Sequence, residues 1–307
     1  MHRRTFVHTL GAALVAPAIG CTPSGGAGAG TAGAGTAAAG TATTASSATG
    51  GRRLKRIGLQ LYSLRDAARG NLDQTLADIR AAGYDDVELL MSNDNFDTPA
   101  ARVRAMLDKH GLRAPSTHMG SQSIGAANLE RTLDEASVLG HRYLFVASLP
   151  GDARRSLDAY RSWGDRMNEA GTVARKRDIW IGFHNHGDDH VVLDGAVAYD
   201  ALVERTDPSV VRHQLDTGNA AMGGKDPLDY MKRYGDRYWS FHIKDVPSVR
   251  AKQDAELGKG ILDLRGILAL AAKDIDEKLV YVEQESYPGS PLDSVKRDYQ
   301  YISSLRF

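Results

Sequence analysis

Side chains that could bind a metal ion stand near the ends of four apolar runs in the second half of the chain. Each run contributes one imidazole or carboxylate, and the four groups are His184, Asp216, His242 and Glu283. Consecutive runs are separated by about the length of one strand and one helix. If such units close into a barrel, the four strand ends meet at one mouth. Two imidazoles and two carboxylates could then bind one divalent cation, and this mixture suits Mn²⁺, Zn²⁺, Co²⁺ or Fe²⁺ without selecting one of them.

The first of these runs, WIGFHNH, offers two histidines. His184 and His186 lie on the same side of an extended strand, because strand side chains alternate, and Asn185 lies between them. Either histidine could be the metal ligand. We expect His186 to be a catalytic group if His184 binds the metal, and Asn185 to contact the substrate.

A lysine shares the strand face of the third predicted ligand. His242 and Lys244 are two residues apart in WSFHIKD, so both side chains point the same way. We expect Lys244 to be a catalytic residue that contacts a substrate oxygen or carboxylate. The alternative is a structural salt bridge to Asp245 or Glu256.

Two glutamates, Glu283 and Glu285, lie at the end of the last apolar run. Two further polar residues, Glu88 and His118, lie near the ends of earlier runs. Glu283 lies deeper in its strand than Glu285, and a carboxylate buried in a barrel needs a metal or another cation beside it. Glu283 is therefore both a predicted ligand and a candidate catalytic residue, and Glu285 is a peripheral substrate contact. Glu88 and His118, on the second and third predicted strands, are candidates for acid or base groups or for substrate contacts.

A metal ion held by four protein ligands has two open positions when it is six-coordinate. A substrate could fill both positions with a carbonyl oxygen and its neighbouring hydroxyl. The metal would polarise the carbonyl and stabilise the enediolate that forms when a nearby carboxylate or imidazole removes the adjacent proton. Return of the proton to the neighbouring carbon gives isomerisation, return to the opposite face gives epimerisation, and loss of a β-hydroxyl gives elimination.

Eight strand-like runs alternate with eight helical patterns after residue 52. The predicted strands cover 56–64, 84–90, 112–120, 142–150, 178–186, 210–218, 238–245 and 278–286. The predicted helices cover 72–83, 98–111, 126–139, 153–176, 195–205, 226–235, 262–274 and 291–305. No tight hairpin turn is expected between two strands, so helical crossovers imply parallel pairing. Eight units with polar residues at the strand ends favour a (β/α)8 TIM barrel over a doubly wound open sheet.

The composition is ordinary for a globular protein with a sizeable core. Of 307 residues, 42% are hydrophobic and 25% are charged, with 38 basic and 38 acidic side chains. This balance provides no basic field for nucleic acid, so we expect no nucleic-acid partner. A single cysteine excludes a disulfide framework, and the length suits one barrel domain over residues 52–307.

The first 51 residues are predicted to lie outside the folded domain. Residues 1–21 combine paired arginines with an apolar stretch too short to cross a bilayer, which takes about 20 apolar residues, and so indicate a twin-arginine export signal. Cys21 stands where a bacterial lipoprotein carries its lipid, and ordinary signal peptidase cleavage is the alternative. Residues 22–51 are mostly Gly, Ala, Thr and Ser, which indicates a flexible linker. We expect an exported protein, periplasmic or anchored to the membrane through Cys21.

A set of motifs, taken in order, resembles the xylose isomerase-like TIM barrel superfamily and its sugar phosphate isomerase/epimerase branch. They are IGLQLYSLRD, GYDDVELL, HNH, DTGN followed by GGKDP, FHIKD, ELGKG and VEQE. The resemblance covers about residues 54–307. It implies a barrel whose metal ligands fall on strands five to eight, at His184, Asp216, His242 and Glu283. Many ketose epimerases of the superfamily have glutamate at the first of these positions, where this chain has HNH.

The resemblance implies a range of reactions, because the superfamily includes sugar isomerases, ketose epimerases, inosose dehydratase, hydroxypyruvate isomerase and a DNA-repair endonuclease. Sugar phosphates are intracellular, so an exported member should act on a non-phosphorylated sugar or keto-sugar. Our leading hypothesis is a divalent-metal-dependent isomerase, epimerase or lyase. The alternatives are a catalytically silent sugar-binding lipoprotein and an endonuclease, which would need three metal ions and a basic groove. The sequence leaves open whether the chain forms homo-oligomers.

Overall fold

A computed structural model describes residues 51–307 of the chain. The predicted export signal, Cys21 and all but the last residue of the predicted linker lie outside the described residues. Within the described residues, no helix is both long enough and apolar enough to cross a membrane.

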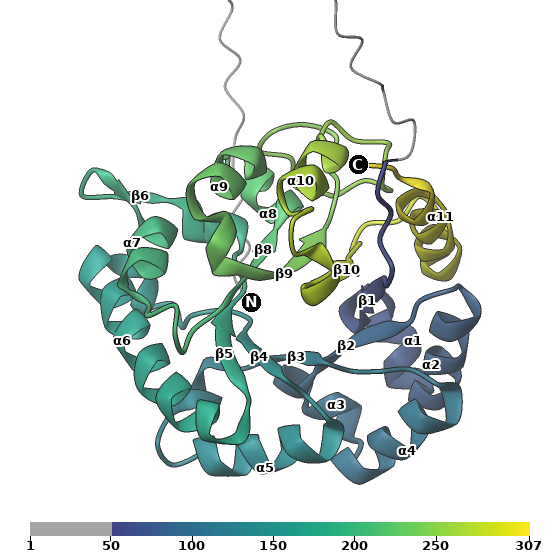
Figure 1. Cartoon of the computed structure of the whole chain (residues 1–307), viewed down its shortest axis with the longest axis horizontal. Coiled ribbons are helices and arrows are strands. Elements are labelled where there is room, and N and C mark those ends of the chain that lie inside the picture. Colours follow the sequence, from purple (N-terminus) through teal and green to yellow (C-terminus); the bar gives the residue numbers. More distant parts are fainter. Residues whose placement is uncertain (1–50) are drawn as a thin grey trace, which may run out of the picture. The chain divides into compact units, whose positions relative to one another are not determined.

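Eight parallel strands form the wall of a nearly closed barrel (Figure 1). In chain order they are β1 (Gly58–Gln60), β2 (Asp86–Leu90), β3 (Ser116–Met119), β4 (Tyr143–Val146), β5 (Trp180–Phe183), β8 (His213–Asp216), β9 (Tyr238–Ile243) and β10 (Leu279–Val282). They pair in the order β5-β4-β3-β2-β1-β10-β9-β8. At the seam between β5 and β8, Arg212 N donates a hydrogen bond to Ile181 O at 3.0 Å, and isolated bridges continue the contact. The predicted (β/α)8 barrel is therefore confirmed.

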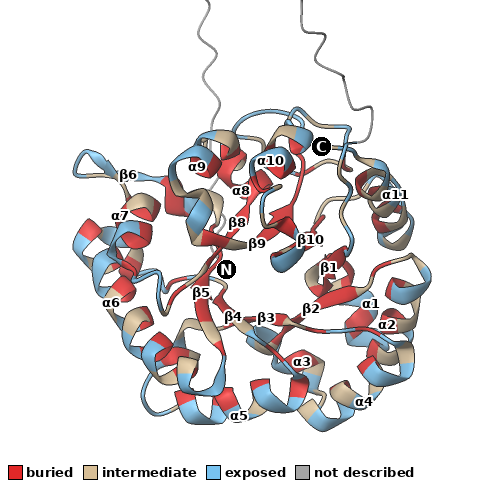
Figure 2. Cartoon of the chain, viewed as in Figure 1, coloured by how far each residue is buried: buried red, intermediate tan, exposed pale blue. Residues whose placement is uncertain are grey.

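Helices surround the barrel with their buried faces toward the strands (Figure 2). The longer helices are α2 (Leu72–Ala81), α4 (Ala100–His110), α5 (Leu129–Leu139), α6 (Leu157–Ala174), α7 (Ala198–Arg205), α9 (Pro227–Tyr234), α10 (Leu264–Leu270) and α11 (Pro291–Ser304). Shorter helical segments lie in the connections: α1 (Arg65–Gly70), α3 (Asp94–Asp97), α8 (Thr217–Met222), and the 3-10 turns η1 (Leu61–Leu64), η2 (Met91–Asn93), η3 (Ser121–Ile124), η4 (Ala153–Arg155), η5 (Arg175–Arg177), η6 (Gly187–His190), η7 (Gly235–Arg237) and η8 (Ile275–Glu277).

Capping residues determine where several helices begin and end. Asp226 accepts a hydrogen bond from Leu228 N at 2.9 Å, and Pro227 occupies the first position of α9, where an N–H group would have no partner within the helix. Gly111 ends α4 with a φ of 65°, a left-handed conformation that glycine adopts without strain. These two helices lie where the sequence predicts them.

Two local elements differ from the prediction. The first strand is three residues long rather than covering 56–64, because the chain turns at Leu61 into η1 and then α1. A hairpin outside the barrel joins β6 (Val192–Leu193) to β7 (Ala196–Val197), and neither of these short strands was among the eight predicted ones. Asp194 and Gly195 form its turn with φ angles of 47° and 83°, the positive values of a type I′ hairpin.

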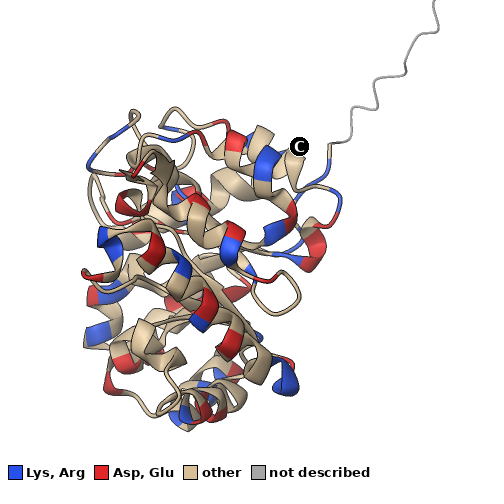
Figure 3. Cartoon of the chain, turned by 90° about the vertical axis from the view of Figure 1, so that its left-hand side faces the viewer, with Lys and Arg blue, Asp and Glu red and all other residues tan. Residues whose placement is uncertain are grey.

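Basic and acidic residues are interspersed along the ribbon shown in Figure 3. Exposed ion pairs in the described part of the chain include those of Arg177 with Glu130 and Asp134, both at 2.5 Å. Exposed pairs of this kind contribute about 0–1 kcal/mol each. The stability of the domain therefore comes mainly from the apolar core between the barrel and its helices.

Asp298, on α11, is a buried carboxylate whose ionisation should affect stability. Its Oδ1 accepts a hydrogen bond from Leu257 N at 2.8 Å, and its Oδ2 has no hydrogen-bond partner within the described part of the chain. Burial raises the pKa of Asp298 to about 7 against the effect of the Leu257 N–H, with Glu256 and Asp254 adding to the rise and Arg297 opposing it.

The substitution Asp298→Asn should remove a pH dependence of stability. In the wild type, Asp298 ionises near pH 4 in the unfolded chain but only near pH 7 in the folded chain, so the free energy of unfolding falls as the pH rises through this window. We expect the variant to gain about 4 kcal/mol relative to the wild type between pH 4 and pH 8, because the pKa of Asp298 differs by about three between the unfolded and the folded chain. Urea unfolding at the two pH values measures this gain. A constant difference between the two proteins would contradict it.

Candidate active site

The four predicted metal ligands meet at the carboxyl ends of the strands. They are His184, which follows β5, Asp216 at the end of β8, His242 in β9, and Glu283, which follows β10. One side-chain atom from each residue lies within 4.8 Å of those from the other three, and all four residues are buried. A group of this size could bind one metal ion. We call these four residues the metal cluster.

The donor set of the metal cluster fits a divalent cation. Asp216 Oδ2 is buried and accepts no hydrogen bond from any described residue, and it lies 3.3 Å from Lys244 Nζ and 3.8 Å from His242 Nδ1. Burial raises the pKa of Asp216 to about 7 although Lys244 opposes the rise, and Glu283 adds to it. A buried carboxylate with an unsatisfied oxygen is stabilised by a metal ion.

Lys244 lies among three carboxylates. Its Nζ is 3.3 Å from Asp216 Oδ2, 3.0 Å from Glu283 Oε2 and 2.7 Å from Glu285 Oε1. Burial lowers the pKa of Lys244, but the carboxylates outweigh burial and raise it well above its usual value, so the ammonium stays charged. Gly218 leaves space for this side chain, because a Cβ atom there would lie 2.5 Å from Lys244 Cγ. The sequence suggested Asp245 or Glu256 as a salt-bridge partner of Lys244, and neither is among these three carboxylates.

His242 is held between two glutamates. Its Nδ1 lies 2.9 Å from Glu283 Oε2, and its Nε2 contacts Glu88 Oε2. Burial lowers the pKa of His242, but Glu283 and Glu88 outweigh burial and raise it to about 10. Binding of a metal ion requires the neutral imidazole, so a bound cation would replace this proton. Glu88 is fully buried, and its carboxylate contacts His242, which is a member of the metal cluster.

Gln214, which the sequence analysis did not single out, orients His184. Its Oε1 lies 2.8 Å from both His184 Nδ1 and His118 Nε2, while its Nε2 donates to Glu88 Oε1 at 2.9 Å. An amide oxygen only accepts hydrogen bonds, so His184 carries its proton on Nδ1. The lone pair of His184 is therefore on Nε2, which lies 4.0 Å from Asp216 Oδ2. The sequence does contain a signal for this role. Gln214 lies two residues before Asp216, so both side chains are on the same face of the strand.

The substitution Gln214→Met should lower metal affinity by about 10- to 100-fold, as is usual when a residue that orients a metal ligand is lost. The imidazole of His184 would then be free to rotate and to adopt the other tautomer. Calorimetric titration of the metal-free protein with Zn²⁺ measures this change. Unchanged zinc affinity in a folded variant would show that Gln214 does not orient His184.

His186 lies beside the metal cluster rather than within it. Its ring centroid is 4.8 Å from that of His184, and its Nδ1 is buried with no hydrogen-bond partner among residues 51–307. Burial lowers the pKa of His186 to about 4, and Lys244 adds to the effect, so the ring is neutral near pH 7. Of the two histidines that the sequence left open, His184 is the one in the metal cluster.

A cavity of about 350 Å³ opens beside the metal cluster, and we call it the reaction cavity. Its wall includes five predicted site residues: His118, His184, His186, Glu283 and Glu285. The wall also includes Tyr62, Asn93 and Arg154, which the sequence did not reveal because they lie in connections without a strand-end pattern. Arg154 forms an ion pair with Asp188, another residue of the wall. A volume of this size is typical of small-molecule sites.

Asn185 bonds to the backbone of the neighbouring strand. Its Oδ1 accepts a hydrogen bond from Asp216 N at 2.9 Å, and its Nδ2 donates to Asp216 O at 3.1 Å. Asn185 is fully buried and is not part of the wall of the reaction cavity. Its predicted contact with the substrate stays a prediction, and its bonds in the structure position Asp216.

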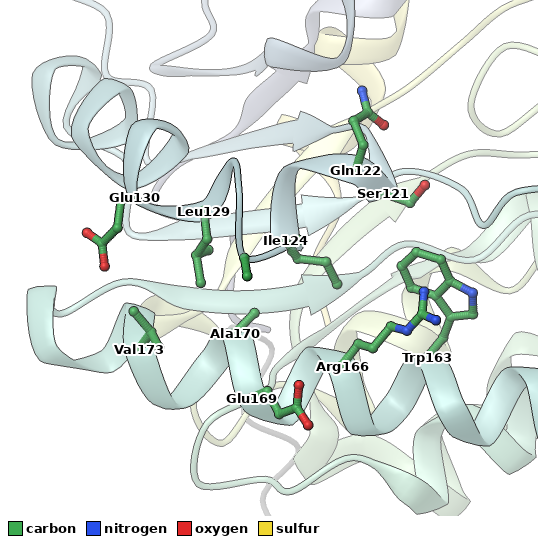
Figure 4. Close-up of a pocket in the computed structure, with 12 residues that line it drawn as sticks. Ser121, Gln122, Ile124, Leu129, Glu130, Trp163, Arg166, Glu169, Ala170 and Val173 are labelled. Carbon is green, nitrogen blue, oxygen red and sulfur yellow. The ribbon is translucent and has the colours of Figure 1, made fainter.

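Another hollow lies outside the barrel, between η3 and the helices α5 and α6 (Figure 4). Its volume is about 530 Å³, and the guanidinium of Arg166 lies 4.8 Å from the ring centre of Trp163 on its wall. None of the predicted ligands or catalytic residues lines it. The candidate active site is therefore the reaction cavity, where the titratable groups meet.

Residues 76–305 match the family described as the xylose isomerase-like TIM barrel. The chain belongs to this family, which confirms the resemblance seen in the motifs. Among curated relatives, the inosose dehydratase of Geobacillus kaustophilus (strain HTA426) is 28% identical over 195 residues, which cover 57% of this chain. The matched part spans 62% of that relative, which is less than two thirds of its length.

Solved structures share the same barrel. A sugar phosphate isomerase/epimerase from Parabacteroides distasonis ATCC 8503 superposes with a TM-score of 0.69 and 25% identity, over 84% of this chain and 96% of the other. A zinc-bound IolI protein superposes with a TM-score of 0.63 and 14% identity, over 82% of this chain and 99% of the other, which shows a common fold. Both solved structures thus share the barrel fold of this chain.

Proposed function

We propose that the protein is a divalent-metal-dependent isomerase, epimerase or lyase that acts on a non-phosphorylated sugar or keto-sugar. The observation that carries the proposal is the meeting of two imidazoles and two carboxylates within 4.8 Å of one another, beside a cavity of about 350 Å³. The inosose dehydratase relatives and the sugar phosphate isomerase/epimerase neighbour support a reaction on a sugar.

The metal ion would be bound by the metal cluster, His184, Asp216, His242 and Glu283. A divalent cation there supplies Lewis-acid polarisation of a substrate carbonyl, which acidifies the adjacent C–H bond. Mn²⁺, Zn²⁺, Co²⁺ and Fe²⁺ all suit the ligand set, and the zinc-bound IolI neighbour supports testing Zn²⁺ first.

Proton transfer is assigned to His186 rather than to Glu283. Glu283 Oε2 lies 2.9 Å from His242 Nδ1 and 3.0 Å from Lys244 Nζ. Burial raises the pKa of Glu283, but Lys244 and His242 outweigh burial and hold it well below its usual value, so this carboxylate is a weak base. His186 is neutral and lines the reaction cavity, so its imidazole can accept a proton from the substrate and return it.

Several other groups would support the reaction. Lys244 is 1% exposed and is not part of the wall of the reaction cavity, so its predicted contact with a substrate oxygen stays a prediction, and its charged ammonium neutralises the carboxylates around it. His118 and Glu285 line the reaction cavity and can contact substrate hydroxyls. Glu88 is fully buried behind His242, so we assign it a positioning role through that imidazole.

The charges of the reaction cavity support a substrate without phosphate. Its wall carries three carboxylates, Asp188, Glu283 and Glu285, and one guanidinium, Arg154, which is paired with Asp188. Lys244 already pairs with Glu283 and Glu285, and Arg154 pairs with Asp188, so among the described residues the wall offers no unpaired lysine or arginine to bind a phosphate group. We also propose, from the sequence alone, that the export signal and a lipid at Cys21 carry the enzyme to the periplasmic side of a membrane, where free sugars occur.

The proposal is tested with metal-loaded protein and a panel of sugars and keto-sugars in deuterated water. Solvent deuterium in recovered substrate or product would demonstrate proton transfer at carbon, and the labelled position would separate isomerisation, epimerisation and elimination. Sugar binding without any label would identify a silent sugar-binding protein instead. Three metal ions per chain together with DNA cleavage would point to the endonuclease class.

A further inference from the structure

A second cavity adjoins the reaction cavity, and the proposed reaction does not use it. Its volume is about 530 Å³. Its wall is formed by the loop that connects β9 with α10 and by the loop that connects β10 with α11. These loops follow the strands that lead to Lys244 and Glu283, so the second cavity lies at the same end of the barrel as the metal cluster.

Glu285 is the residue that the two cavities share. Its carboxylate contacts Lys244 Nζ at 2.7 Å, on the side of the metal cluster. Its backbone N–H donates to Asp254 Oδ2 at 2.6 Å, and Asp254 lines the second cavity. One residue therefore separates the place where a sugar would react from a neighbouring space large enough for another small molecule.

The second cavity is built before any ligand arrives. The carboxylate of Asp245 accepts hydrogen bonds at 2.9–3.1 Å from four backbone N–H groups, those of Val246, Gly258, Gly260 and Leu262. Asp254 ties the two loops together, because it also accepts a hydrogen bond from Ser286 N at 2.7 Å. Gly260 is required at its position, since a Cβ atom there would lie 2.1 Å from Asp245 Oδ1. Loops that are already ordered lose less conformational entropy when a ligand binds.

The wall of the second cavity offers hydrogen bonds without an excess of positive charge. Its ionisable groups are Asp254, Glu256, Lys259 and Glu285. Gln284 is 1% exposed, and its Oε1 has no hydrogen-bond partner in the described residues, while its Nε2 donates to Ser286 O at 2.7 Å. Tyr287 adds an aromatic ring to the wall. Glu285 pairs with Lys244 and Glu256 pairs with Arg297, which leaves Lys259 as one cationic group of the wall for a phosphate, whereas a neutral ring rich in hydroxyls could pack on the tyrosine and bond to the polar groups.

We propose that the second cavity is a subsite for a second sugar unit, so that the substrate is a disaccharide or another glycoside rather than a monosaccharide. This inference rests on the proposed function. The reacting ring occupies the reaction cavity, and the linked ring passes Glu285 into the second cavity. The subsite thereby explains two neighbouring spaces that are both polar and both poor in cations.

Calorimetric titration of the full-length, metal-loaded chain tests the subsite without requiring turnover. The probes are glucose, a panel of α- and β-linked glucose disaccharides, and glucose 6-phosphate. In the wild type we expect at least one disaccharide to bind about tenfold more tightly than glucose, the gain expected from one or two added hydrogen bonds. Glucose 6-phosphate should bind no more tightly than glucose.

Two variants test whether the tighter binding of a disaccharide arises in the second cavity. Ala255 lines the second cavity, and Ala255→Trp should fill it and remove the tenfold advantage of the disaccharide while leaving glucose affinity unchanged. Lys259→Ala removes a polar group from the wall with little risk to folding, because Lys259 is exposed, and should weaken only disaccharide binding by about threefold. Lys252→Ala is the matched control, since Lys252 is an exposed lysine of the same loop that does not line the cavity.

The outcomes separate this inference from the proposed function. Equal affinity of the wild type for glucose and every disaccharide, or variants that weaken glucose and disaccharides alike, would overturn the subsite and leave the proposed function standing. Tighter binding of glucose 6-phosphate that is lost in Ala255→Trp would assign the second cavity to phosphate and overturn it too. A wild type that binds no sugar would overturn the proposed function itself.

Discussion

Turnover should fall by about a thousandfold when Asp216 is replaced by alanine, and the variant should lose most of its bound metal. Asp216 supplies one of the two carboxylates of the metal cluster, and its Oδ2 has no hydrogen-bond partner in the described residues. A metal ion stabilises a developing oxyanion by several kcal/mol, and about 4 kcal/mol corresponds to a thousandfold change in rate. Glu283→Ala should have a similar effect, because it removes the other carboxylate.

Asp158→Asn is the matched control for the loss of a carboxylate. The side chain of Asp158 is 91% exposed on α6 and pairs with Arg161 at 2.9 Å, far from any predicted ligand in the sequence. This variant should keep the metal content and turnover of the wild type. Elemental analysis of the purified proteins measures the metal, and label uptake in deuterated water measures turnover. Full metal content and full turnover in Asp216→Ala would remove the metal cluster from the mechanism.

The second large effect concerns stability. The substitution Lys244→Met should lower the free energy of unfolding of the metal-free protein by about 3–5 kcal/mol, as is typical when one partner of a buried ion pair is removed. Asp216, Glu283 and Glu285 all have an oxygen within 3.3 Å of Lys244 Nζ, and they would lose the cation they share. Methionine keeps much of the volume of lysine, so the loss of packing should be small.

Divalent metal should restore much of the stability of Lys244→Met, because a bound cation neutralises the same carboxylates. Scanning calorimetry with chelator and with added Zn²⁺ measures both the loss and its recovery. The stabilisation by Zn²⁺ should be larger in the variant than in the wild type. Lys252→Met, a change of an exposed lysine, should behave as the wild type does. A variant as stable as the wild type in chelator would contradict the view that Lys244 neutralises these carboxylates.

The barrel itself could be predicted because its signals are local. Each strand is a short apolar run and each helix has its own period and caps, as at Asp226 and Gly111. Parallel pairing follows from alternation with helices, and closure follows from the number of units. The misjudged elements were those where a turn competes with a strand, at Leu61–Leu64 and at the hairpin of Asp194 and Gly195.

The sequence by itself determined which side chains stand at the strand ends, since strand periodicity and spacing place His184, Asp216, His242 and Glu283 at one rim once the barrel closes. Only the tertiary structure decided which groups touch across that rim. In the folded chain, the hydrogen bond from His184 Nδ1 to Gln214 leaves the lone pair of His184 on Nε2, and three carboxylates surround Lys244. The reason is physical: periodicity describes the direction of a side chain along its own strand, whereas protonation and metal affinity depend on distances of a few ångströms between groups that are far apart in the chain.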